Sequence, residues 1–182
     1  MRNVVVYEFM TLDGVVEGIE GFFTGQADDD LDDRLAAAVI ASQDAVILGR
    51  RSFDLWATFW PTAQIEPFAS FVNSVPKYVA TSTPLATEWA GSRVIDGDLV
   101  AFVRDLKAQP GRDIGVHASI SVAQALLTAG VVDELRLVVA PGTAGAGRRL
   151  LDGVPPVNLT LLAGLTSSTG NLLLHYRVDE RR

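Results

Sequence analysis

A short basic turn is the strongest chemical signal in the sequence. Residues 48–52 read Leu-Gly-Arg-Arg-Ser, between a buried-strand pattern and a helical pattern. The first turn of a helix exposes free backbone N–H groups and the positive end of the helix dipole. Gly49, Arg50, Arg51 and Ser52 therefore form a candidate phosphate site. The alternative is that Gly49 only makes the turn and that the arginines balance surface acids.

A second turn has a similar pattern. Residues 116–120 pass from a predicted strand into a predicted helix, and the small residues Ala118 and Ser119, followed by Ile120, would let a phosphate approach the backbone. Neither turn has the Gly-Lys-Ser ending of a P-loop, and no G-x-G-x-x-G follows a strand. The glycine-rich run at 142–147 is interpreted as a bend.

Three further side chains are candidates for contact with a substrate. Asp13 follows the first predicted strand and could deliver a proton or orient a substrate, although an Asp-Gly turn explains it equally well. Trp56 and Trp60 could form a stacking wall for a flat heterocycle, or they could belong to the core.

The sequence contains no pattern typical of a metal site or of a hydrolytic catalytic triad. The acidic run at 28–33 lacks the spacing of a calcium loop and instead suits the start of a helix, so no metal site is expected. His117 and His175 are interpreted as structural, and no Ser-His-Asp arrangement follows from local spacing.

Alternating strand and helix patterns must position these turns. Strands are expected at residues 3–9, 45–48, 77–81, 93–95, 113–117, 134–140, 157–165 and 172–178, and helices at 35–41, from 52, 67–73, 98–108 and 119–128. This order predicts an α/β fold: a mostly parallel central sheet flanked by helices, with antiparallel C-terminal strands. Ligands of such sheets bind at the carboxyl ends of the strands.

Composition limits the remaining possibilities. A chain of 182 residues predicts one domain over 1–182. The formal charge of −7 gives no reason to expect nucleic-acid binding, and no apolar run approaches the length of a membrane span. The sequence contains no cysteine, which excludes thiol chemistry and is compatible with the expected cytoplasmic location.

Four segments in register resemble the dihydrofolate reductase-like superfamily, and more closely the reductase domain of riboflavin-biosynthesis deaminase-reductases and its stand-alone bacterial relatives. These segments are residues 4–15, 47–53, 76–79 and 130–137. The resemblance implies an NADPH-dependent reductase, often a homodimer, with the cofactor across the strand ends.

The resemblance also assigns roles to individual positions. It places the cofactor phosphates at Gly49, Arg50, Arg51, Ser52, Ser119 and Ile120, the adenosine at Thr81 and Ser82, and the nicotinamide at the backbone of Gly14 and Val15. Two positions depart from the family pattern. Ala118 stands where relatives usually have glycine, and Thr83 stands where they often have a basic residue.

The expected function is therefore reduction of a small heterocyclic, pteridine- or pyrimidine-like, or carbonyl substrate by NADPH. The alternatives are a non-catalytic nucleotide-binding protein, which Ala118 and Thr83 favour, and a dimeric structural protein on the same fold. The apolar final strands could pair across a two-fold axis in a homodimer.

Overall fold

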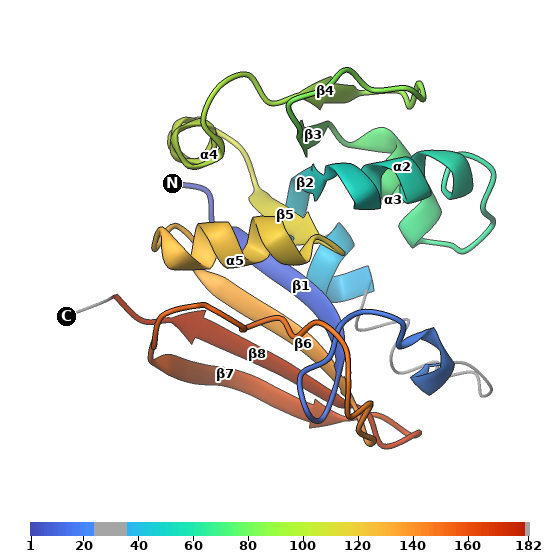
Figure 1. Cartoon of the computed structure of the whole chain (residues 1–182), viewed down its shortest axis with the longest axis vertical. Helices are drawn as coiled ribbons and strands as arrows, with labels where there is room; N and C mark the ends of the chain where they lie inside the picture. The colour runs from blue at the N-terminus through green and yellow to red at the C-terminus, as the bar shows by residue number, and fades with distance from the viewer. Residues whose placement is uncertain (24–35, 181–182) are drawn as a thin grey trace.

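Eight strands form one continuous sheet in the computed structural model, which describes residues 1–23 and 36–180. The spatial order is β4-β3-β2-β5-β1-β6-β8-β7 (Figure 1). The strands are β1 Val4–Thr11, β2 Gln43–Gly49, β3 Lys77–Ala80, β4 Ser92–Val94, β5 Asp113–His117, β6 Glu134–Ala140, β7 Leu159–Thr166 and β8 Leu172–Val178. The pairs from β4 to β6 are parallel, whereas β8 is antiparallel to both β6 and β7. The predicted α/β architecture is confirmed.

Helices cover the two faces of the parallel strands. They are α2 Arg50–Phe59, α3 Phe68–Ser74, α4 Leu99–Ala108 and α5 Ile120–Thr128. Helices α4 and α5 bury their apolar side chains in one core with Val4 and Val6, whereas α2 and α3 pack in a second core with Tyr7. Alternation along β1 therefore sends consecutive side chains into different cores.

Most boundaries lie within two residues of those expected. Asp98 precedes α4 and caps it, because its Oδ1 accepts a hydrogen bond of 2.9 Å from Ala101 N. Of the helix expected at 35–41, the structure describes Ala36–Ile40 as one π-helical turn. The acidic run at 28–33 lies outside the described residues. No helix among the described residues is long and apolar enough to span a membrane.

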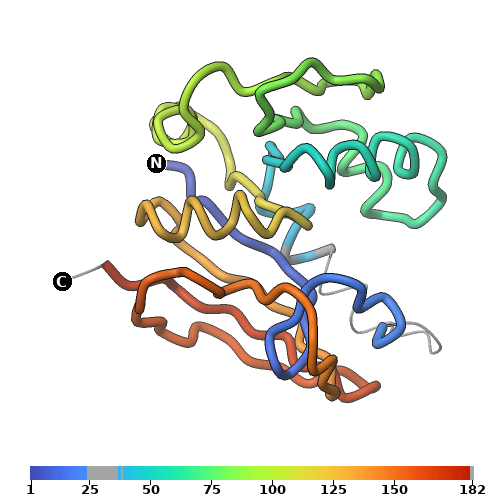
Figure 2. The backbone as a smooth tube through the Cα atoms, in the orientation of Figure 1, coloured from blue at the N-terminus to red at the C-terminus, as the bar shows by residue number. Residues whose placement is uncertain are grey.

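The two final strands are less well covered than the others. Figure 2 shows β7 and β8 as a long hairpin at one end of the sheet, and every residue of β7 is at least partly exposed. The apolar side chains of Leu161, Leu162, Leu165 and Leu172 are 38–54% exposed. These leucines leave apolar surface exposed at this end of the sheet.

Candidate functional site

The two predicted phosphate turns meet at the β2–β5 pair, from which the chain continues toward opposite edges of the sheet. From β2 the chain passes through α2 and α3 to β3 on one side, and from β5 it passes through α5 to β6 on the other. Such a switch point leaves a crevice at the carboxyl ends of the two strands. A groove of about 570 Å³ lies there, which we call the strand-end groove. It is lined by Glu8, Val16, Glu17, Gly18, Glu20, residues 49–52, Leu55, Trp56, Ala80, Leu99, residues 118–122 and Arg148.

Hydrogen bonds join the two turns directly. Gly49 N donates to Ser119 Oγ at 2.9 Å, and Ser52 Oγ donates to the carbonyl of Ala118. The hydroxyl of Ser119 therefore links the start of α5 to the start of α2 and does not cap its own helix. Both helices begin without a side-chain cap. Their free first-turn N–H groups and positive dipole ends line one groove, an arrangement that favours an anion.

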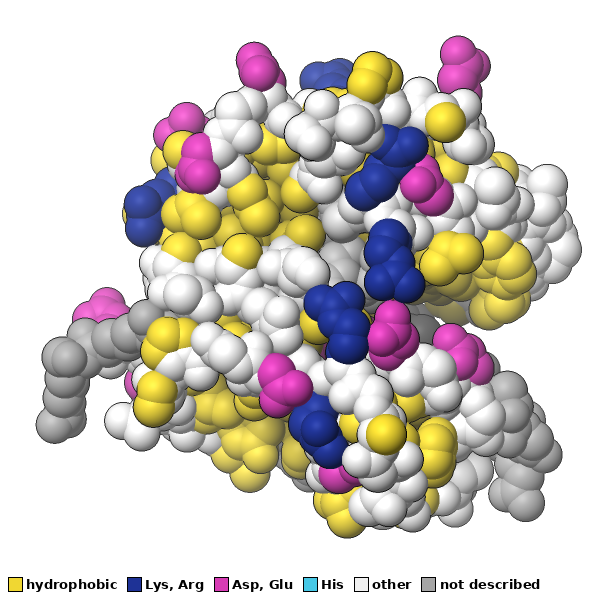
Figure 3. Space-filling view, in the orientation of Figure 1, with side chains coloured by type: hydrophobic (Ala, Val, Ile, Leu, Met, Phe, Trp, Pro, Cys, Tyr) yellow, Lys and Arg dark blue, Asp and Glu magenta, His cyan; other side chains and the backbone are white. Residues whose placement is uncertain are grey.

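Three arginines lie along this groove. Arg50 donates to Asp54 through Nε and to Thr83 Oγ1 and Pro84 O through Nη1, at 2.6 and 2.9 Å. Arg51 is 81% exposed and lies 3.5 Å from a carboxylate oxygen of Glu17. In the space-filling view, basic side chains form a broken row with carboxylates between them, across the region where α2 faces α5 (Figure 3).

Arg148 brings the third guanidinium from a distant part of the sequence. Its Nη2 donates to the neutral hydroxyl of Ser121 on α5 at 3.0 Å. A guanidinium held by a neutral hydroxyl keeps its full charge for a ligand. No local pattern in the sequence indicates this residue, because its place in the groove depends on how the loop after β6 returns to α5.

The predicted adenosine residues lie in an adjoining hollow. Thr81 and Ser82 line a space of about 870 Å³ between the loops after β3 and β4, which we call the β3–β4 hollow. It shares Ala80 and Leu99 with the strand-end groove. Since Arg50 lines the groove and also binds the loop at Thr83, one guanidinium connects the two spaces.

A buried carboxyl group, Glu8, lines the strand-end groove. The residue is 8% exposed, and its Oε2 has no hydrogen-bond partner among the described residues. Burial raises the pKa of Glu8 to about 8, against a smaller opposing effect of a backbone hydrogen bond from Phe9. The group is therefore a neutral acid at pH 7. A lone acid inside an otherwise apolar strand is the signal that could have identified it.

The structure does not support a proton-donor role for Asp13. Its carboxylate accepts hydrogen bonds from Thr11 Oγ1 at 2.6 Å and from the backbone N–H groups of Ala144 and Gly145 at 3.1 and 2.8 Å. These bonds, with that of Thr11 the strongest, lower the pKa of Asp13 to about 2. Asp13 also does not line the groove. It anchors the glycine-rich loop.

Gly14 and Val15 belong to the same anchored turn. Gly14 has φ +80°, a backbone conformation that favours glycine, and Val15 is fully buried. Neither lines the groove, which is instead reached by Val16 and Glu17. The groove-lining residues of this segment therefore follow the predicted pair by one or two positions, and the contact of Gly14 and Val15 with a nicotinamide stays a prediction.

Of the two predicted stacking residues, Trp56 lines the groove and Trp60 packs in the aromatic core. Trp56 lines the strand-end groove and also lies 5.7 Å, centroid to centroid, from Trp60. Trp60 does not line the groove and packs on Phe68 at 4.8 Å. Burial lowers the pKa of His117 in this aromatic cluster to about 3, so the ring is neutral, and its Nε2 pairs with Gln43 Oε1 at 2.8 Å.

In the two turns, the residue with a positive φ is Ala118 and not the glycine, Gly49. Gly49 has φ −77°, which any residue adopts, and an added Cβ would meet only ordinary contacts at 3.5 Å or more. Ala118, in contrast, has φ +47°. The left-handed conformation therefore falls on the alanine that stands where relatives usually have glycine.

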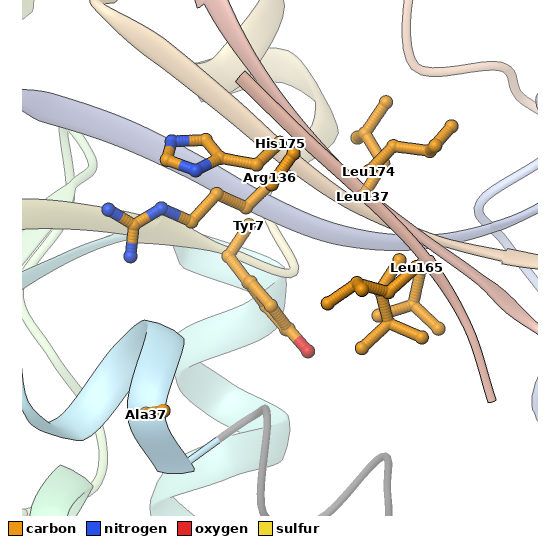
Figure 4. Close-up of a pocket in the computed structure, with 10 residues that line it drawn as sticks. Tyr7, Ala37, Arg136, Leu137, Leu165, Leu174 and His175 are labelled. Atoms are coloured by element: carbon orange, nitrogen blue, oxygen red, sulfur yellow. The ribbon is translucent and has the colours of Figure 1, made fainter. Parts of the chain in front are cut away.

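A separate hollow of about 380 Å³ lies on the other face of β1, and we call it the leucine hollow. Its lining includes the cross-strand neighbours Tyr7, Arg136 and His175 together with leucines (Figure 4). Arg136 binds Glu134 at 2.8 Å and approaches Asp113 at 3.8 Å, and His175 also binds Glu134. No cluster of metal-binding side chains occurs among residues 1–23 and 36–180.

The sheet order and the groove at its switch point define an α/β protein with a dihydrofolate reductase-like fold. Residues 2–173 match the RibD C-terminal domain family, and the chain belongs to that family. It is also 28% identical over 181 residues to YyaP of Bacillus subtilis, an uncharacterised protein, with 96% of this chain and 94% of YyaP covered.

Solved structures show the same fold. A putative riboflavin biosynthesis protein from Shewanella sp. PV-4 superposes with a TM-score of 0.79 at 18% identity, covering 99% of this chain and all of that one. A pyrimidine reductase-like protein from Corynebacterium diphtheriae gives 0.70 at 16% identity, covering 99% and 93%. A deaminase/5-amino-6-(5-phosphoribosylamino)uracil reductase from Thermotoga maritima gives 0.66 at 16% identity, covering 98% of this chain and 57% of that one. The resemblance found in the sequence is confirmed.

Proposed function

We propose that this protein is an NADPH-dependent reductase of a small heterocyclic substrate. The observation that carries the proposal is the joining of two uncapped helix N-termini, by the Gly49–Ser119 hydrogen bond, in one groove with three arginines. Backbone donors and guanidiniums together suit the pyrophosphate of a dinucleotide. Membership in a family that includes reductases supports the same reaction class.

The position of Arg50 supports NADPH over NADH. NADPH differs by a phosphate on the adenosine ribose, which needs a positive charge near the adenosine. Thr83 supplies no charge, but the guanidinium of Arg50 binds Thr83 Oγ1 and lies between the groove and the β3–β4 hollow. Helix α2 thus brings to this loop the charge that relatives often carry in the loop itself.

The bound cofactor would supply the hydride, and residues of the chain would hold the cofactor and the substrate in place. Arg50, Ser52 and Ser119 hold the phosphates. Trp56 offers an aromatic surface in the same groove for a flat ring. A pyrimidine-like substrate fits this surface, and two of the structural relatives are described as pyrimidine reductase-like or as a uracil-derivative reductase.

Calorimetric titration with NADPH and NADH tests the proposal. We expect saturable micromolar binding of NADPH and weaker binding of NADH. No binding of either would reject the reductase and favour the dimeric structural protein. Binding without oxidation of NADPH across a panel of pyrimidines, pteridines and carbonyl compounds would favour the nucleotide-binding alternative, for which the methyl group of Ala118 in the groove is the supporting observation.

We further propose that the chain forms a homodimer through β7 and β8. Four leucines of this hairpin, Leu161, Leu162, Leu165 and Leu172, are 38–54% exposed, and a second copy could cover apolar surface of the hairpin by two-fold symmetry. Light scattering should give twice the chain mass of 19.5 kDa. Leu161→Glu should reduce it to the chain mass without loss of the fold, and a monomeric parent protein would reject the dimer.

We also propose that residues 1–182 act as one unit in the cytoplasm. The strands form one sheet, and the family match spans nearly all of it. The absence of cysteine is compatible with a reducing compartment.

A further inference from the structure

The order of strands predicts how a dinucleotide would lie across the sheet. Strands β3, β2, β5 and β1 are consecutive neighbours. The β3–β4 hollow lies at the end of β3, and the two phosphate turns lie at the ends of β2 and β5. Glu8 lies in the middle of β1, one residue beyond the Tyr7–His117 pair at which β5 ends. At roughly 4.8 Å per strand, the distance from β3 to β1 is roughly 14 Å. With adenosine at β3 and pyrophosphate at β2 and β5, the nicotinamide nucleoside falls at β1.

The side chain of Glu8 is placed to contact a ligand at the β1 end of the groove. Its side chain projects from β1 on the α5 face, as do those of Val6 and Met10, which pack in the α5 core. It is more than nine-tenths buried, lines the groove, and leaves Oε2 without a partner in the described part of the chain. A buried polar atom without a partner is costly, and a ligand that supplies the missing hydrogen bond recovers that cost.

We propose that the carboxyl group of Glu8 contributes to cofactor affinity, its Oε2–H donating a hydrogen bond to an oxygen of the nicotinamide nucleoside half, such as the carboxamide carbonyl. This inference rests on the proposed function. It assigns Glu8 to the groove end opposite Arg50, where no basic side chain of β1 or α5 is present. Ionised Glu8 loses the donor and repels the nearby phosphates, so the cofactor dissociates more readily at alkaline pH.

Other charged groups also face the groove, and the test must distinguish their effect on cofactor affinity from that of Glu8. They are Glu17 and Glu20 from the loop after β1, Arg50 and Arg51 from α2, and Arg148 from the loop after β6. Helix α5, which covers Glu8, has no ionisable side chain, and the β6 residue paired with Glu8 is Leu137. His117 of β5 points into the opposite core and is neutral. A variant that changes Glu8 alone leaves all these groups in place.

Calorimetry of the full chain from pH 6.5 to 9.5 provides the test, with NADPH and with 2′,5′-ADP, which contains only the adenosine half. Glu8→Gln keeps a neutral donor, and Glu8→Leu removes it. At pH 6.5 we expect the parent and Glu8→Gln to bind NADPH within about threefold of each other, and Glu8→Leu to bind about tenfold more weakly. Above pH 8 the parent should lose up to about tenfold in affinity per pH unit, beyond any loss by Glu8→Gln. At pH 6.5, binding of 2′,5′-ADP should be the same in all three proteins.

Each result has a distinct meaning. Absence of NADPH binding by the parent at pH 6.5 rejects the proposed function. Binding with the same pH profile in the parent and Glu8→Gln leaves that function standing and overturns the role of Glu8. Equal loss of 2′,5′-ADP affinity in Glu8→Leu also overturns it, since the effect would then be general. Carbon-13 NMR of the free protein adds a direct readout: the Glu8 carboxyl should titrate near pH 8, and titration below pH 5 contradicts the proposal.

Discussion

The strand-end groove and the leucine hollow are built from adjacent residues of one strand, and they offer a ligand different chemistry. Glu8 faces the groove and Tyr7 lines the hollow, because successive side chains of β1 point to opposite faces. In the groove, the guanidinium of Arg148 donates to the neutral hydroxyl of Ser121. In the hollow, Arg136 is held by two carboxylates. The carboxylates beside Arg136 already balance its charge, whereas the hydroxyl beside Arg148 leaves the charge of that guanidinium available to an anion.

Removing Arg136 should give a large change at every pH, and it should be a change in stability. Arg136, Glu134 and Asp113 are each less than 20% exposed, so Arg136→Met leaves two mostly buried carboxylates without their cation. We expect the free energy of unfolding in urea to fall by about 3 kcal/mol, with NADPH affinity unchanged. Arg177→Met is the control, because this arginine is 57% exposed and its loss should cost less than about 0.5 kcal/mol. Reduced NADPH affinity in Arg136→Met would show that the hollow takes part in binding.

Replacing Glu8 should change how stability depends on pH. Burial raises the pKa of Glu8 from 4.5 to about 8, so between these values the folded chain holds a proton that the unfolded chain has released. The free energy of unfolding should therefore decrease as pH rises through this window and level off above it. Glu8→Gln should remove about 2–4 kcal/mol of this decrease, measured by urea unfolding at pH 5 and pH 8.5. The exposed Glu88→Gln serves as control, and equal slopes in all three proteins would contradict the burial argument.

Arg50→Ala tests the charge that links the groove to the β3–β4 hollow. The dissociation constant for NADPH should rise about 10- to 100-fold, corresponding to about 1–3 kcal/mol. The constant for NADH should rise less, because NADH lacks the ribose phosphate. Arg104→Ala on the exposed side of α4 is the matched control. Unchanged NADPH affinity in Arg50→Ala would reject the assignment of this turn to the cofactor.

The smallest effect is expected at Ala118. Its φ of +47° is unfavourable for alanine, so Ala118→Gly should raise the free energy of unfolding by about 0.5–1 kcal/mol and strengthen NADPH binding a few-fold by removing a methyl group from the groove. Thermal unfolding measures the first effect. Gly14→Ala, at φ +80°, is the reciprocal control and should destabilise by about 1 kcal/mol. A destabilised Ala118→Gly would mean that the methyl group has packing contacts that outweigh the backbone strain.

The sequence was sufficient to predict the helices and strands, but not the contacts between residues that are far apart in the chain. Local apolar periodicity and turn residues are sufficient to predict β6 and β8 with their observed bounds. The switch point also follows from βα alternation, so the positions of Gly49 and Ser119 could be anticipated. The partners of Asp13 could not, because Ala144 and Gly145 lie more than 130 residues away in the chain. Glu8 was missed because its burial and its unpaired oxygen depend on the packing of α5 and the loops around it.

The position of β5 has a consequence for how the molecule assembles. Before residue 113 is made, β1 has no strand partner, and β2 is paired only with β3. These two parts of the nascent polypeptide are connected only by the covalent chain until β5 inserts between them. The groove exists only after that insertion and also includes Arg148 from the loop after β6, so ligand capture during synthesis should begin only after residues 113–148 have emerged from the ribosome.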